Sequence, residues 1–169
     1  MTLLVLSDSH GRREHIERAI ALSGKTEAVL FLGDGLGDLD PSLCDAPIYA
    51  VRGNCDCFGF SHSSEPDERM ITFGEYNVLM MHGHTHSVKS NPDIAIAYAA
   101  QKGADLLLYG HTHQKHEQFI PAGSTVCGIT LKTPIRVMNP GSIGKPDSGY
   151  SFGTVTIRKK EILLGFGRI

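Results

Sequence analysis

The sequence predicts a single α/β domain over residues 1–169. Short runs of consecutive apolar residues, typical of strands that are buried on both faces, alternate with segments expected to be helical. This alternation indicates βαβ units, in which a sheet lies between layers of other elements. The chain is 41% hydrophobic and 20% charged, the composition of an ordinary globular domain, and no linker or repeat divides it.

In the first part of the chain, three strands and one helix are expected. The strands are apolar runs that stop at segments rich in glycine and polar residues, and they cover residues 2–6, 28–32 and 47–51. The helix is expected over residues 13–22, with Gly24 closing it. The polar segment 58–67 has no clear period and is expected to be a loop.

A hairpin and a second helix are expected next. Residues 69–73 and 76–81 flank Gly74-Glu75, a pattern typical of two strands joined by a tight turn. The second helix opens at Asn91-Pro92-Asp93, which offers an N-cap, a proline at the first helical position and an early acid, and it runs to Gly103. The remaining strands are expected at residues 105–109, 116–120, 125–131, 135–138, 154–157 and 162–166, with a turn-rich interruption at 139–149.

Composition argues against several classes of protein. The formal net charge of −2 gives no basic excess for non-specific nucleic-acid binding. No apolar stretch approaches the ~18–20 residues that a membrane-spanning helix needs, and no secretory signal is evident, so we expect a cytoplasmic protein without membrane contact. The cysteines lack the usual spacing of zinc or redox pairs and are expected to be reduced thiols: Cys44, Cys55, Cys57 and Cys127.

The most informative feature is the position of seven polar residues. Each of them follows an apolar strand at its carboxyl end: Asp8, His10, Asp34, Asn54, His82, His111 and His113. Ligands bind at this edge of open α/β sheets, so five strand ends on one edge would gather these side chains in one cluster. Neighbouring glycines are expected to let the backbone turn sharply there: Gly11, Gly33, Gly53, Gly83 and Gly110.

These residue types suit two divalent transition-metal ions. Carboxylate, imidazole and amide oxygen favour Mn²⁺, Fe²⁺, Zn²⁺, Ni²⁺ or Co²⁺ over a purely oxygen-ligated Mg²⁺ or Ca²⁺ site. Asp8 and His10 are two positions apart, as are His111 and His113, so in an extended segment each pair would point the same way. Asp34 stands alone and is the candidate to bridge two ions. Each motif by itself is usually a turn or a surface residue, and only the whole set indicates a metal centre.

At these residues the sequence resembles the calcineurin-like metallophosphoesterase superfamily. The motifs stand in the family's order: Asp8-Ser-His10, Gly33-Asp34, Gly53-Asn54-Cys55-Asp56, His82-Gly-His84 and Gly110-His111-Thr-His113. Together with Asn139-Pro-Gly-Ser142 they are most similar to the branch of small YfcE/MJ0936-type phosphodiesterases, which is related to Vps29. The resemblance implies a four-layer α/β/β/α sandwich of two mixed sheets.

The resemblance also implies roles for individual residues. One ion would take Asp8, His10 and His113, the other would take Asn54, His82 and His111, and Asp34 would bridge them. Asn54 and His84 are candidates for catalysis and substrate binding. His84 and His86 are further candidates for proton transfer or phosphate contact. Many relatives carry histidine at position 55, where it can protonate the leaving group; Cys55 is either a weaker acid in that place or a small filler. Arg52 is expected to pair nearby.

The function indicated is a metal-dependent phosphodiesterase in which a hydroxide held by two ions attacks a small phosphodiester, with a nucleotide as one candidate substrate. Two divalent ions together with Asp8, Asp34 and this hydroxide have a net charge of about +1. A site with this charge suits a phosphodiester monoanion. Mn²⁺ is the favoured metal. The alternative is a non-catalytic, Vps29-like protein-interaction scaffold, which the complete ligand set disfavours. Homo-oligomerisation stays open.

Overall fold

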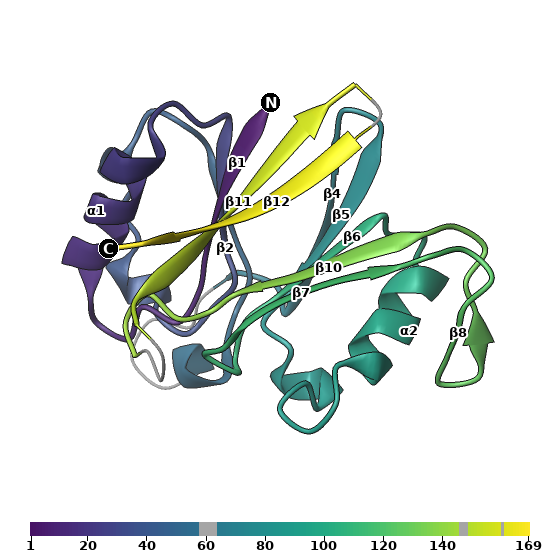
Figure 1. The fold of residues 1–169 in the computed structure, drawn as a ribbon. Coiled ribbons are helices and arrows are strands. Elements are labelled where there is room, and N and C mark those ends of the chain that lie inside the picture. The colour runs from purple at the N-terminus through teal and green to yellow at the C-terminus, as the bar shows by residue number, and fades with distance from the viewer. Residues whose placement is uncertain (58–63, 146–148, 160) are drawn as a thin grey trace.

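The computed structural model describes residues 1–57, 64–145, 149–159 and 161–169 and contains two five-stranded sheets (Figure 1). The first sheet has the order β12-β11-β1-β2-β3. Its strands are β1 (Thr2–Leu6), β2 (Ala28–Phe31), β3 (Ile48–Ala50), β11 (Ser151–Arg158) and β12 (Glu161–Arg168). Strands β1, β2 and β3 are parallel, and β11 is antiparallel to both β1 and β12.

The second sheet has the order β4-β5-β6-β10-β7. Its strands are β4 (Glu68–Phe73), β5 (Tyr76–Met81), β6 (Leu106–Tyr109), β7 (Lys115–Ile120) and β10 (Ile135–Pro140). The central strands β5, β6 and β10 are parallel, and the edge strands β4 and β7 are antiparallel to their neighbours. A separate two-stranded hairpin consists of β8 (Thr125–Val126) and β9 (Ile129–Thr130).

Two helices cover the outer faces of the sheets. Helix α1 (Arg13–Ser23) connects β1 to β2, and α2 (Asp93–Gln101) connects β5 to β6. Figure 1 shows α1 beside the first sheet and α2 beside the second, on opposite sides of the molecule. Short 3₁₀ turns lie in the connections: η1 (Leu36–Asp38), η2 (Pro41–Leu43), η3 (Asn54–Cys57) and η4 (His84–His86).

The hydrophobic core has three layers, which explains the continuous apolar strands. In β1, Leu3 and Val5 belong to the cluster between the two sheets, whereas Leu4 and Leu6 pack in the cluster that contains Ile16 of α1. Strand side chains alternate between faces, so a strand covered on both sides must be apolar at every position. The second sheet packs against α2 in the same way. The predicted four-layer sandwich is confirmed.

Most predicted elements are confirmed, including both helices and the hairpin around Gly74. The single strand expected over residues 125–131 is wrong. The chain reverses at Cys127 and Gly128, whose φ values are 48° and 77°, so that Thr125 pairs with Thr130. The turn-rich segment starts two residues later than expected, because β10 continues through Pro140. Residues 58–63 of the expected loop lie outside the described residues.

The expectation that five strand ends share one sheet edge is also corrected. Strands β1, β2 and β3 belong to the first sheet, whereas β5 and β6 belong to the second. The seven polar residues therefore come from two sheets packed face to face. Their side chains lie close together because the two sheets pack against each other, and because of the order of the strands within each sheet.

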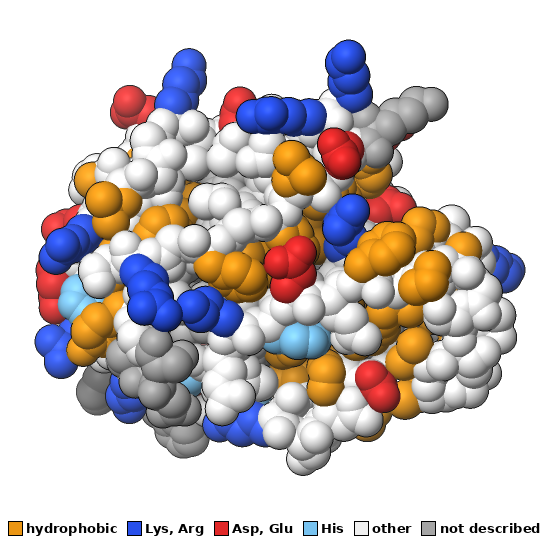
Figure 2. All heavy atoms as spheres, viewed as in Figure 1, with side chains coloured by type: hydrophobic (Ala, Val, Ile, Leu, Met, Phe, Trp, Pro, Cys, Tyr) orange, Lys and Arg blue, Asp and Glu red, His pale blue; other side chains and the backbone are white. Residues whose placement is uncertain are grey.

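The described part of the chain contains no helix that combines the length and apolar character needed to cross a membrane. Figure 2 shows acidic and basic side chains interspersed with apolar ones on the viewed face. This face has no extended area of a single charge sign, in agreement with the near-neutral composition.

One carboxylate ties the loops after β2 and β3 together. Asp56, in η3, accepts hydrogen bonds through Oδ2 from the N–H groups of Asp34 and Gly53, both at 2.8 Å. Its Oδ1 accepts from Gly35 at 2.8 Å and Leu36 at 2.9 Å. Hydrogen bonds to an ionised acceptor are roughly twice as strong as neutral ones. Asp56 thus fixes the backbone on both sides of Asp34 and directly before Asn54.

A second tie holds the loop after β1. The carbonyl oxygen of Asp8 accepts hydrogen bonds from Ser142 Oγ at 2.9 Å and from the N–H of Gly144 at 3.0 Å. The N–H of Ile143 donates to the carbonyl oxygen of Ser7 at 3.0 Å. The segment after β10 therefore acts as a strap across the loop that carries Asp8 and His10.

We predict that Asp56→Asn lowers the free energy of unfolding by about 2–4 kcal/mol, because the amide keeps one acceptor oxygen and turns an NH₂ group toward backbone donors. Urea unfolding followed by circular dichroism measures the change. The matched control is Asp45→Asn, at an exposed aspartate outside this network, which should unfold near the parental midpoint. Equal midpoints for all three proteins would contradict the anchoring role of Asp56.

Candidate metal centre

All seven predicted residues lie together at the carboxyl ends of β1, β2, β3, β5 and β6. Asp8, Asp34 and His82 are buried, with at most 2% of their surface exposed. The other four are half-buried: His10, Asn54, His111 and His113. Their distances define two groups of side chains, and the role of these residues as metal ligands stays a prediction.

The first group contains Asp8, His10 and His113. His113 Nε2 lies 3.3 Å from Asp8 Oδ1 and 3.4 Å from His10 Nε2. His10 Nε2 lies 3.9 Å from Asp8 Oδ1. A cation with bonds of about 2.0–2.2 Å holds its ligand atoms roughly 3–3.5 Å apart, so this group needs only a small contraction to enclose one.

The second group contains Asp34, His82, His111 and Asn54. His82 Nε2 lies 3.4 Å from Asp34 Oδ2, 3.1 Å from His111 Nδ1 and 3.2 Å from Asn54 Oδ1. The opposite ring nitrogen, His82 Nδ1, lies 2.7 Å from the carbonyl oxygen of Leu32. Because a carbonyl oxygen only accepts, Nδ1 carries the proton of the neutral ring, and the lone pair of Nε2 faces the group.

Asp34 lies between the two groups. Its Oδ1 accepts a hydrogen bond from the N–H of Cys55 at 2.7 Å. Its Oδ2 lies 3.4 Å from His82 Nε2 and 3.9 Å from His10 Nε2, nitrogen atoms of different groups. A single oxygen of Asp34 therefore faces both candidate sites.

One carboxylate oxygen of Asp8 has no hydrogen-bond partner among the described residues and indicates whether a cation fits in the first group. Asp8 Oδ2 accepts hydrogen bonds from Ser7 Oγ and from the N–H of His111. Asp8 Oδ1 is buried and has no hydrogen-bond partner among the described residues. A buried carboxylate oxygen without a partner is costly, and imidazole nitrogens at 3.3–4.0 Å surround this one. A divalent cation would satisfy it, so the residues fit a metal.

Two histidines are held in the neutral form that binds metals. Burial lowers the pKa of His111 to about 4, and the charges of His82 and Lys89 add to this effect. Burial also lowers the pKa of His10, although the charges of Asp8 and Asp34 oppose it. Neutral imidazole is the ligand form of histidine, so neither ring has to lose a proton at neutral pH.

Asp34 and His82 behave as a buried ion pair when no cation is bound. Burial opposes ionisation of Asp34, but the hydrogen bond and charge of His82 outweigh it and hold the pKa of Asp34 well below its usual range. Burial likewise lowers the pKa of His82, yet the hydrogen bond to Asp34 and the charge of Asp8 raise it overall. The carboxylates of Asp34 and Asp8 thus stabilise positive charge at this position.

The backbone of the site is not extended, which corrects the expectation for the Asp8/His10 and His111/His113 pairs. Five of the seven residues have left-handed backbone conformations: Asp8 (φ 57°), His10 (46°), Asp34 (59°), His111 (67°) and His113 (59°). Non-glycine residues with positive φ are uncommon and concentrate at functional sites. The side chains converge because each loop doubles back beyond its strand.

Two of the predicted glycines are needed for space. Neither Gly53 nor Gly110 has a positive φ. A Cβ atom at Gly53 would overlap Asp34 Oδ1 and the Asp34 backbone, and one at Gly110 would overlap Ser7 Oγ. These glycines allow close approach of neighbouring loops, a different reason from the sharp turn that we expected.

Cys55 lies at the exposed rim of the site. Its thiol accepts a hydrogen bond from Asn54 Nδ2 at 3.3 Å. Burial and the neighbouring Asp34 carboxylate raise the pKa of Cys55 to about 11. A thiol with this pKa stays protonated at neutral pH and is a poor match for an imidazole acid.

The remaining predicted side chains lie in different surroundings. The His84 ring centre lies 5.4 Å from that of His82, and His84 Nδ1 is buried without a hydrogen-bond partner among the described residues. The His86 ring instead packs on Tyr98 of α2, at 4.8 Å. Arg52 pairs with Asp67, at 3.0 Å through Nε and 2.8 Å through Nη2, as expected.

Three contributors to the site were not identified in the sequence. Asp56 fixes two loops, Ser7 donates to Asp8, and the Leu32 carbonyl orients His82. Asp56 had a signal, because an acid two positions after a candidate ligand in a glycine-led turn often accepts from backbone N–H groups. The roles of Ser7 and Leu32 depend on contacts between segments far apart in sequence.

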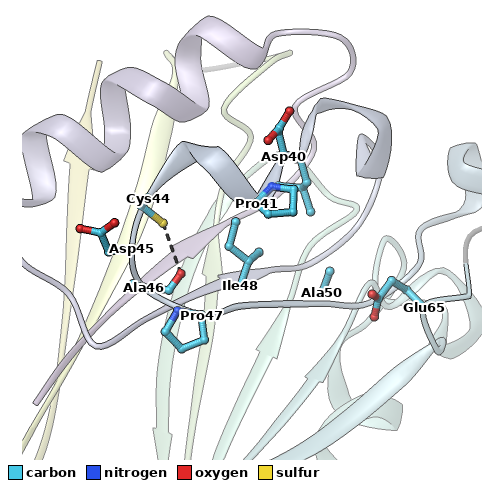
Figure 3. Close-up of a pocket in the computed structure, with 10 residues that line it drawn as sticks. Asp40, Pro41, Cys44, Asp45, Ala46, Pro47, Ile48, Ala50 and Glu65 are labelled. Carbon is cyan, nitrogen blue, oxygen red and sulfur yellow. Dashed lines mark hydrogen bonds between the residues drawn. The ribbon is translucent and has the colours of Figure 1, made fainter.

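A separate cavity of about 370 Å³ lies next to η2. Figure 3 shows its lining side chains, including Asp40, Pro41, Cys44 and Ile48, with the Cys44 thiol turned toward the carbonyl oxygen of Ala46 at 3.5 Å. None of the seven candidate ligands lines this cavity. It is therefore distinct from the metal centre.

Comparisons with known proteins agree with this geometry. Residues 1–160 match the calcineurin-like phosphoesterase superfamily domain. The probable metallophosphoesterase YsnB of Bacillus subtilis is 34% identical over 149 residues, which are 86% of this chain and 77% of YsnB. A predicted phosphoesterase from Streptococcus pneumoniae is 27% identical with a TM-score of 0.75, over 99% of this chain and 88% of that one.

More distant structures share the fold. An archaeal phosphodiesterase is 23% identical with a TM-score of 0.68, over 98% of this chain and 99% of that one. Vps29 structures are 17–20% identical with TM-scores of 0.67–0.72. The domain match covers nearly the whole chain. The chain therefore belongs to the calcineurin-like phosphoesterase superfamily.

Proposed function

We propose that this protein is a phosphodiesterase with a dinuclear metal centre. The observation that carries the proposal is the pair of side-chain groups that share Asp34. Asp8, His10 and His113 would hold one ion, Asn54, His82 and His111 the other, and Asp34 Oδ2 would bridge them. Mn²⁺ is the expected metal in the cytoplasm, with Ni²⁺, Zn²⁺, Fe²⁺ and Co²⁺ as other ions of suitable chemistry.

The bound ions would supply Lewis acidity toward the phosphoryl oxygens and a nucleophile derived from water. The residues of the chain set the geometry of that reaction. Ser7 and the His111 N–H hold one oxygen of Asp8 and leave the other for a cation. The Leu32 carbonyl fixes the His82 ring. Lys89 and Lys145, whose charges act on His111 and His10, favour an anionic substrate.

Substrate contact is assigned to Asn54 and His84. Asn54 belongs to the second group, and the His84 ring centre lies 6.2 Å from that of His111. His84 would donate a hydrogen bond to a phosphoryl oxygen through Nε2. Cys55 occupies the rim where a leaving group would depart. The archaeal phosphodiesterase with the same fold supports a diester substrate, and a nucleotide is one candidate.

The competing hypothesis is a non-catalytic scaffold of the Vps29 type. A scaffold places no demand on metal ligands, whereas all seven positions here carry competent residues in one cluster. This completeness favours the enzyme. The two hypotheses are separated by metal-dependent turnover.

We predict that metal-stripped protein does not hydrolyse bis(4-nitrophenyl) phosphate and that Mn²⁺ restores the activity. The reason is the mixed carboxylate, imidazole and amide ligand set around Asp34. Release of 4-nitrophenol is measured with and without added metal, and elemental analysis confirms removal. Full activity of verified metal-free protein in excess chelator would overturn the metal-dependent mechanism.

Asp34→Ala should reduce kcat/KM by at least about a hundredfold, because both ions lose a ligand. His84→Ala should cost less, about tenfold, because it removes one hydrogen bond to substrate. His86→Ala is the matched control, since this ring packs on α2 and should leave turnover unchanged. Circular dichroism checks the fold of each variant. Near-parental turnover of Asp34→Ala would contradict the bridging assignment.

Cys55→His should accelerate hydrolysis of diesters with basic leaving groups more than those with acidic phenols, because only basic leaving groups need a proton donor. Cys55→Ala should change little for good leaving groups. The measurement is the slope of log kcat/KM against leaving-group pKa for the parent and both variants. Three identical slopes would mean that position 55 has no acid role.

A further inference from the structure

The Cys55 thiol belongs to a third group of potential ligands, between the two described above. His10, Asp34 and Cys55 each offer one donor atom, and the three atoms all lie within 4.8 Å of one another. They come from the separate loops after β1, β2 and β3. The cluster therefore joins a sulfur atom to two residues already assigned to the metal centre.

The backbone at Cys55 is fixed, but its sulfur atom can move. The Cys55 N–H donates to Asp34 Oδ1 at 2.7 Å, and Asp56 accepts a hydrogen bond from the N–H of Gly53, two positions before Cys55. The thiol itself is exposed, and rotation about a single side-chain bond changes its position. Ligands of a tetrahedral Zn²⁺ lie roughly 3.3–3.8 Å apart, so a shift of about 1 Å would bring sulfur into bonding range.

We propose that Cys55 is a ligand for thiophilic divalent cations at this edge of the centre. Zn²⁺, Cd²⁺ or Co²⁺ binds the Cys55 thiolate together with His10 and Asp34, whereas Mn²⁺ leaves the thiol unbound. A sulfur–metal bond forms, the thiol proton goes to solvent, and no electrons are transferred. The inference rests on the proposed metal centre, because two of the three ligands belong to it.

The difference between metals follows from ligand softness. Thiolates bind Zn²⁺ and softer ions strongly, whereas Mn²⁺ prefers carboxylate and water oxygens. Catalytic metal sites keep one position open for substrate, and closed sites are structural. A thiolate from the rim would close that position. Thiophilic ions should therefore bind tightly but support less turnover than Mn²⁺, so that Cys55 selects the productive metal.

The test is titration of metal-stripped, full-length protein with Co²⁺, followed by absorption spectroscopy. We expect a thiolate-to-cobalt charge-transfer band in the parent and none in Cys55→Ser. Cys127→Ser is the matched control, because Cys127 is an exposed thiol in the β8–β9 turn, and its band should equal that of the parent. Cys55→Ser should also weaken Zn²⁺ binding by at least about tenfold, while Mn²⁺ binding changes by less than about twofold.

The outcomes separate this inference from the proposed function. Co²⁺ binding without a thiolate band in the parent, or a band that persists in Cys55→Ser, overturns the thiolate ligand and leaves the metal centre intact. Absence of any Co²⁺, Zn²⁺ or Mn²⁺ binding by calorimetry overturns both. Circular dichroism of Cys55→Ser confirms that loss of the band reflects loss of the sulfur atom.

Discussion

Four backbone N–H groups from two loops point at the carboxylate of Asp56, and the candidate ligands after β2 and β3 take their positions from that contact. A loop that leaves the end of a buried strand cannot satisfy these donors by strand pairing, and unsatisfied donors near a core are costly. One ionised acceptor resolves this conflict. It also brings Asp34 and Asn54 from neighbouring strands to one place without help from a cation.

The strap, residues Ser142 to Gly144, fixes the loop after β1 through hydrogen bonds. It uses neutral donors to the Asp8 carbonyl oxygen, and the loop after β6 adds the His111 N–H to the Asp8 carboxylate. Asp8, Asp34 and the backbone before Asn54 are thereby supported by neighbouring loops. Such support orients metal ligands before the metal arrives, and it reduces the conformational entropy lost on binding.

The sequence predicts much of this arrangement because strands that are buried on both faces appear in it as runs of apolar residues. Residues 3–6 and 106–109 are apolar at successive positions, so strands covered on both faces could be identified with their ends. The polar residues that follow those ends then indicated the candidate ligands. The hydrophobic periodicity does not indicate that the five strands belong to two sheets. Only the family resemblance implied this division.

Other features depended on contacts that periodicity cannot reveal. The close approaches at Gly53 and Gly110 are determined by neighbouring loops. The hydrogen bond from His82 to Leu32 joins residues 50 positions apart. Packing between loops decided these details, whereas local sequence decided the strands.

The left-handed conformation of five candidate ligands restricts how this protein can change through mutation. Among residues other than glycine, only aspartate, asparagine and histidine are strongly enriched at positive φ. Glutamate carries a carboxylate and cysteine a thiolate, but neither is among the residues enriched there, although Cys127 adopts a φ of 48° in the β8–β9 turn. In the proposed metal centre, positions 8, 10, 34, 111 and 113 would be constrained twice, once by metal chemistry and once by backbone geometry. A relative that lost catalysis would lose the constraint of metal chemistry and keep that of backbone geometry. Aspartate, asparagine, histidine or glycine would therefore still be favoured at these positions when no ion is bound.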